Sequence, residues 1–100
     1  MKQLTLHFSS AQIFEAVKIS AVNLEMEVKE TKFNASLTLS SGGSFFSYGN
    51  VITVNIENVG ILESLITVSS ESASSLQLID WGTNESLEKD IINEVERILG

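Results

Sequence analysis

The densest group of aromatic side chains in the sequence follows a loop rich in serine and glycine. Phe45, Phe46 and Tyr48 come shortly after Gly42 and Gly43, and this composition is typical of a turn or loop. Three rings beside such a loop could line the mouth of a cavity for an apolar ligand. The alternative is that one or two rings pack in the core, as aromatic residues at the start of strands commonly do.

A second candidate site is the turn Asp80-Trp81-Gly82, which contains the only tryptophan. Its carboxylate could act as a ligand or a base, and its indole could form a stacking surface. In the structural interpretation, which we favour, Trp81 anchors the following helix on a sheet, Gly82 adopts a positive φ and Asp80 accepts hydrogen bonds within the turn. The candidate ligand-binding residues are therefore Phe45, Phe46, Tyr48 and Trp81.

The sequence offers little material for catalysis or metal binding. It contains no cysteine and a single histidine, His7, which excludes thiolate sites and multi-histidine zinc sites. Glu25 and Glu27 alternate along one strand, but no loop gathers the oxygen ligands that calcium prefers. We expect a non-enzymatic protein with no cofactor and no metal. An active site would need carboxylates such as Asp80 and Glu88 to meet in a cleft.

The composition is that of one acidic domain. The chain has 100 residues, 43% of them hydrophobic, and a formal net charge of −7. One core can form from this content, and we expect a single α+β domain over residues 1–100. The negative charge opposes binding to nucleic acid and to anionic membranes, because both require cationic contacts. No segment has the pattern of a signal peptide or a membrane span, so we expect a cytoplasmic protein.

Strands and helices must position these candidates. Alternating apolar and polar residues predict strands at residues 3–8, 24–29, 33–40, 52–57 and 62–69, and a short strand at 76–78. Turns are predicted at Glu30-Thr31-Lys32 and at Asn58-Val59-Gly60. Helical spacing predicts one helix after Ser9, with a capping box, and a longer one after Thr83 or Asn84.

Ile19 and Val22 lie off the apolar stripe of the first helix. Either this helix ends near Ser20, or a small apolar patch is exposed on it.

The strands after the first helix each have one apolar face and one face of Ser, Thr, Asn or Glu. This pattern is typical of an antiparallel sheet covered on one side only. We therefore expect a two-layer α+β fold with five to six antiparallel strands and two helices packed on one face, in the order β-α-β-β-β-β-(β)-α. Residues 51–56 and 65–68 are strongly β-prone, so whichever lies at a sheet edge is a candidate for pairing with another chain.

Two short motifs carry a resemblance to known proteins. Residues 44–50 read Ser-Phe-Phe-Ser-Tyr-Gly-Asn, and residues 79–84 read Ile-Asp-Trp-Gly-Thr-Asn before a helix. This arrangement resembles a family of small uncharacterised bacterial proteins with a TATA-binding-protein-like or helix-grip-like fold. The resemblance implies the fold and no catalytic residue, because proteins with such folds bind ligands as different as DNA and apolar molecules.

The leading functional hypothesis is a small non-enzymatic module that binds an unknown protein partner or forms a homo-oligomer. It rests on the lack of catalytic chemistry and on the β-prone strands. The alternative is a binder of a small apolar ligand in a cavity between the sheet and the C-terminal helix, which the aromatic cluster favours.

Overall fold

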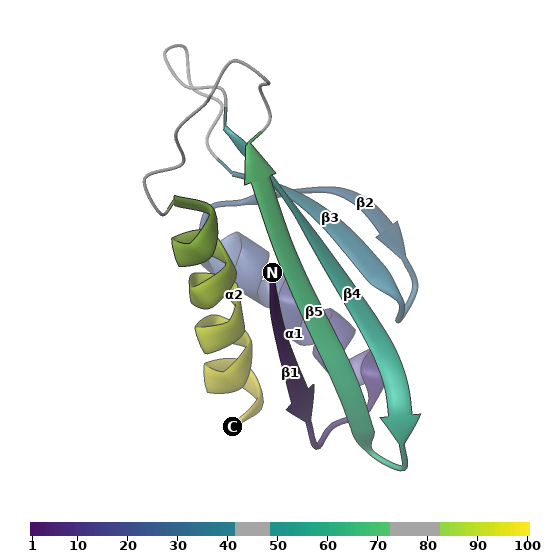
Figure 1. The fold of residues 1–100 in the computed structure, drawn as a ribbon. Coiled ribbons are helices and arrows are strands. Elements are labelled where there is room, and N and C mark those ends of the chain that lie inside the picture. Colours follow the sequence, from purple (N-terminus) through teal and green to yellow (C-terminus); the bar gives the residue numbers. More distant parts are fainter. Residues whose placement is uncertain (42–48, 73–82) are drawn as a thin grey trace.

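The computed structural model describes residues 1–41, 49–72 and 83–100, which form five strands and two helices (Figure 1). The elements follow the predicted order. They are β1 (Lys2–Leu6), α1 (Ser10–Asn23), β2 (Glu27–Lys32), β3 (Ser36–Ser41), β4 (Asn50–Gly60), β5 (Glu63–Ser72) and α2 (Thr83–Leu99).

The strands form one antiparallel sheet in the order β1-β5-β4-β3-β2. Strands β2 to β5 follow one another as hairpins, and β1 joins β5 at the far side. Both helices lie on the same face of this sheet (Figure 1). The predicted two-layer α+β fold is confirmed, while the short strand predicted at residues 76–78 lies outside the described residues.

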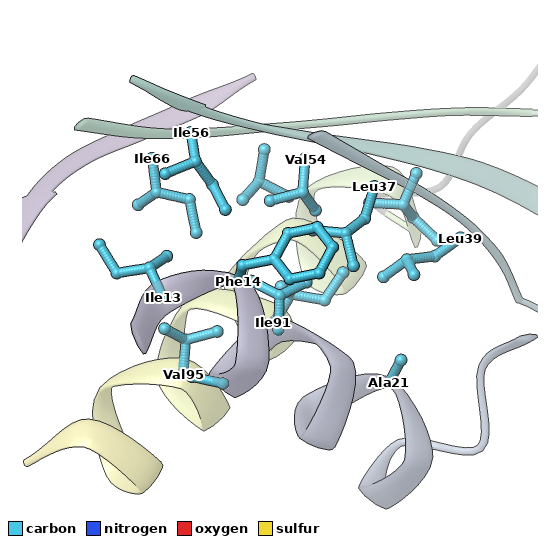
Figure 2. Packing of buried hydrophobic residues seen from close by; sticks show 14 of the residues in the cluster. Ile13, Phe14, Ala21, Leu37, Leu39, Val54, Ile56, Ile66, Ile91 and Val95 are labelled. Carbon is cyan, nitrogen blue, oxygen red and sulfur yellow. The ribbon is translucent and has the colours of Figure 1, made fainter. Parts of the chain in front are cut away.

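The core fills the space between the sheet and the helices (Figure 2). Alternate residues of β3, β4 and β5 point toward the helices, as the period of two requires. Ile13 and Val17 of α1 and Ile91 of α2 meet them with no exposed surface. The fully buried apolar residues of the sheet are Leu37, Leu39, Ile52, Val54, Ile66 and Val68.

Helix α1 begins with the predicted capping box. The backbone N–H of Gln12 donates to Oγ of Ser9 at 3.3 Å, and the backbone N–H of Ser9 donates to Oε1 of Gln12 at 3.0 Å. These bonds occupy two of the backbone donors that a helix start leaves open. The helix continues past Ser20 to Asn23. Of the two alternatives for this helix, the exposed apolar patch is therefore the one observed.

Two predicted turns are displaced toward the C-terminus. Glu30, Thr31 and Lys32 belong to β2, and the turn follows at Phe33, Asn34 and Ala35. Asn34 has a φ of 57°, a conformation that asparagine tolerates better than most residues. Alternation alone missed this turn because Phe33 continues the apolar pattern, although its side chain is 80% exposed.

The second displaced turn joins β4 to β5. Asn58, Val59 and Gly60 were predicted as the turn but extend β4, and the chain reverses at Ile61 and Leu62. Leu62 has a φ of 51°. Its apolar side chain placed it in the predicted strand, yet a left-handed backbone at this position is what closes the hairpin.

Replacement of Ile66 by alanine tests the packing of the sheet against the helices. Ile66 has no exposed surface, so the variant leaves a cavity and should lose about 2 to 5 kcal/mol of unfolding free energy. Ile61→Ala is the matched control, because Ile61 is 97% exposed, and it should change stability by less than about 0.5 kcal/mol. Urea denaturation measures both, and equal losses would contradict the assigned core.

Candidate interaction surfaces

The four candidate ligand-binding residues, Phe45, Phe46, Tyr48 and Trp81, lie outside the described residues. Asp80 lies outside them as well. The roles assigned to these residues therefore stay predictions.

Glu88 on α2 is the only buried charged side chain among the described residues, with 3% of its surface exposed. Its Oε2 accepts the backbone N–H of Ser70 at 2.8 Å, and its Oε1 lies 3.0 Å from the terminal ammonium nitrogen of Met1. Ser70 lies beyond Val68, where the pairing of β5 with β1 stops at Lys2. The carboxylate thus binds the margin of the sheet at a point that β1 does not reach.

His7 lies on the exposed side of the chain after β1. Its Nδ1 is 3.9 Å from Oε2 of Glu63, and the His7 side chain is 84% exposed. A solvated pair of this kind contributes little to stability. It also forms no cleft that would shield a substrate from water. In the described part of the chain, no group of three or more His, Cys, Asp or Glu side chains is placed to hold a metal ion.

An open apolar groove is lined by residues of both helices. It has a volume of about 430 Å³. Ile19 of α1 faces Ile98 and Leu99 of α2 across it. The remaining lining residues are Ala11, Gln12, Glu15 and Ala16.

The groove exists because the apolar surface of each helix is wider than the strip that packs on the sheet. Ile19 is 46% exposed and Val22 is 74% exposed, and both lie on one side of α1 at a spacing of three residues. Ile98 and Leu99 are half-buried on α2. The sequence predicted only the α1 part of this surface, as the exposed patch of Ile19 and Val22.

A polar network joins the two helices near the groove. The side-chain amide of Asn23 donates to Oε1 of Glu94 at 3.3 Å, and Nε of Arg97 donates to the same oxygen at 2.8 Å. The hydrogen bond from Arg97 lowers the pKa of the Glu94 carboxyl, with a smaller contribution from Asn23. Glu94 therefore stays ionised at neutral pH and links the end of α1 to the last turns of α2.

The tip of the β4–β5 hairpin is a second apolar surface. Val59, Ile61 and Leu62 are 50%, 97% and 63% exposed, and the tip extends past the helical layer in Figure 1. Sequence reasoning did not identify this surface, because Leu62 fitted the alternation of a half-buried strand.

The outer face of the sheet is polar, as predicted. Cross-strand rows such as Ser36, Asn55, Thr67 and Gln3 run across four strands, and the side-chain amide of Gln3 donates to Oγ1 of Thr67 at 3.3 Å. Beside the β2–β3 hairpin this face has a hollow of about 470 Å³. It is lined by Glu30, Thr31, Lys32, Ser36 and Thr38.

The strand order identifies the edges of the sheet, which the sequence left open. Residues 51–56 lie in β4 between β3 and β5, and residues 65–68 lie in β5 between β4 and β1. Neither β-prone segment is therefore at an edge. The edge strands are β1 and β2, and all six residues of β2 are exposed.

Comparison with known proteins gives no family for this chain. No protein-family model matches it, and no curated protein matches its sequence. The resemblance to small bacterial proteins thus stays a prediction. None of the helices in the described residues is both long and apolar enough to cross a membrane.

Replacement of Glu88 by alanine tests the contact between α2 and the margin of the sheet. The variant leaves the half-buried Ser70 N–H without its carboxylate acceptor and should lose about 1 to 3 kcal/mol of unfolding free energy. Glu96→Ala removes an exposed carboxylate from the same helix and should have an effect below about 0.5 kcal/mol. If chemical denaturation gives the two variants equal stability, the contact of Glu88 is not a stabilising one.

Proposed function

We propose that this protein is a non-enzymatic interaction module that binds a helical segment of another protein. The observation that supports the proposal is the apolar groove between α1 and α2, where Ile19, Ile98 and Leu99 border a space of about 430 Å³. Two helices that leave such a groove offer the site that an amphipathic third helix fills in helix-in-groove recognition. Exposed apolar surface of this kind commonly marks an interaction site.

The charge of the module indicates the chemistry of the partner. The chain carries a net charge of −7, and Glu15 lines the groove with a side chain that is 61% exposed. Lys18, one turn along α1, lies 3.5 Å from Glu15 and offsets part of its charge, so the preference for a basic partner comes from the net charge of the chain. A partner helix with apolar residues on one face and basic residues beside them therefore fits better than an acidic one.

The position of Glu88 favours binding over catalysis. An active site built on Asp80 and Glu88 would need a carboxylate directed into an open cleft. Glu88 is instead buried and holds the N–H of Ser70 and the terminal ammonium group. Its role in the fold supports a module without chemistry of its own.

The alternative function is binding of a small apolar ligand. The groove volume lies within the range of about 300 to 1,000 Å³ that small-molecule sites occupy. The aromatic residues that first suggested such a ligand, Phe45, Phe46, Tyr48 and Trp81, lie outside the described residues. Native mass spectrometry of the purified protein, followed by titration of Trp81 fluorescence with a fatty acid, separates the two functions. Retained mass and a saturable change would favour the ligand binder.

A pair of synthetic peptides tests the proposed function directly. One peptide is an amphipathic helix of leucine and lysine, and the other carries glutamate in place of lysine. We expect the basic peptide alone to shift the methyl NMR signals of Ile19, Ile98 and Leu99. Ile19→Asp should weaken its binding at least about tenfold, because burial of an aliphatic side chain contributes about 1.5 to 3 kcal/mol.

Val59→Asp is the control, since Val59 is as exposed as Ile19 but lies at the hairpin tip. It should leave the affinity for the basic peptide unchanged. Methyl shifts confined to other parts of the molecule, or equal binding of both peptides, would contradict the proposal.

A further inference from the structure

The edge strand β2 has backbone groups available for another strand. In the described residues it pairs with β3 on one side only, and its outer side borders no labelled element in Figure 1. Every residue of the strand is exposed. Such an edge can be extended by a strand from another chain unless its side chains prevent it.

The charges of β2 are complementary to those of a second β2 strand that runs antiparallel to it. The strand reads Glu27-Val28-Lys29-Glu30-Thr31-Lys32. When two copies run antiparallel about a two-fold axis between Lys29 and Glu30, each Lys29 lies opposite Glu30 of the second copy. In the same register Glu27 lies opposite Lys32, and Val28 lies opposite Thr31. All four charged positions therefore meet the opposite sign, which stabilises cross-strand pairs.

A β-bulge makes this register compatible with the two faces of the sheet. Residues directly opposite each other in an antiparallel pair share a face. In a regular strand Glu27 and Lys32 would point to opposite faces, because they are separated by an odd number of residues. The pairing of β2 with β3 shifts between Val28 and Glu30, and this shift restores a common face.

The partners of β2 in β3 show these faces. Glu27 and Lys32 lie opposite Ser40 and Ser36 on the outer face. Val28 and Thr31 lie opposite Leu39 and Leu37, whose side chains are buried on the helix side. The pairs Glu27–Lys32 and Val28–Thr31 of the antiparallel register therefore each join residues of one face, while Lys29 of the central pair is the bulged residue.

The neighbouring registers are unfavourable. A shift by one residue in either direction places Lys29 opposite Lys29, or Glu30 opposite Glu30, of the second copy. A parallel, in-register arrangement places every charge opposite the same charge. Like charges directly opposite each other are destabilising in a sheet. The charge order thus favours one arrangement of two identical β2 strands over the neighbouring registers.

Apolar side chains in and beside β2 also favour pairing with a second copy of this chain. Val28 is 37% exposed and Phe33 is 80% exposed. The ring of Phe33 contacts Phe14 of α1 edge-on, with centroids 5.8 Å apart, which places it on the helix side of the sheet. A second copy on β2 would cover part of both side chains, and this burial adds to the backbone hydrogen bonds.

From the charge order, the bulge and the exposed apolar margin, we propose that β2 pairs antiparallel with β2 of a second copy of this chain. The five strands of each copy would form one continuous ten-stranded sheet, with the helices of both copies on the same face. This inference rests on the proposed function as an interaction module but uses a surface separate from the groove. An isologous contact of this kind closes on itself and gives a dimer rather than a fibre.

Sedimentation equilibrium over a concentration series reaching about 1 mM tests the dimer. We expect the wild-type protein to dimerise reversibly. Lys29→Glu and Glu30→Lys each place like charges opposite each other twice per dimer, and each should weaken dimerisation at least tenfold. The double variant, which exchanges the two charges, restores complementarity and should return the dissociation constant to within about threefold of the wild type.

Three results would overturn the proposal: a wild-type monomer at every concentration, a dimer that both single variants retain, or a double variant that stays monomeric. Lys29→Glu also removes the 3.1 Å ion pair of Lys29 with Glu27 within one copy, whereas Glu30→Lys does not. Weaker dimerisation of both variants therefore reports the contact between copies and not the loss of this ion pair. Ile19→Asp should not alter dimerisation, and Lys29→Glu should not alter binding of the leucine-lysine peptide. The proposed dimer and the proposed peptide binding in the groove can thus be refuted independently of each other.

Discussion

The structure depends on one constraint, which is that its antiparallel sheet is apolar on a single face. That face contributes fully buried side chains from β3, β4 and β5, and exposure of this area to water would remove the main favourable free energy of folding. One helix is too narrow to cover it. Helix α1 and helix α2 therefore lie together against the sheet (Figure 2), and Glu88 ties the second helix to the margin that β1 leaves uncovered.

The groove between the helices and the exposed edge strand β2 are consequences of the same constraint. Two helices side by side bury their facing strips and leave a groove that Ile19, Ile98 and Leu99 help to line. A sheet of five strands has two edges. The edge strand β2 has no buried residue. Packing of the core therefore does not determine the order of its charged residues. We infer that this order serves association, because the core does not require it.

The sequence predicted the fold well because burial sets the period of its apolar residues. The alternation of β3, β4 and β5 and the Ser9 capping box were sufficient for the two-layer architecture. The turns were less predictable, since Phe33 and Leu62 continue an apolar pattern while Asn34 and Leu62 adopt a positive φ. The edge strands could not be predicted, because pairing order depends on contacts between distant residues and no local pattern shows that β1 joins β5. The roles of Phe45, Phe46, Tyr48 and Trp81 stay predictions.

The central claim is that this fold associates with other chains, first of all with a second copy of itself through β2. Residue-resolved amide hydrogen exchange at low and high protein concentration tests this claim most directly. The account predicts that amides of β2 exchange more slowly at high concentration while those of β1 and of the β4–β5 tip do not change. Exchange that is independent of concentration throughout β2, or new protection confined to another segment, would contradict it.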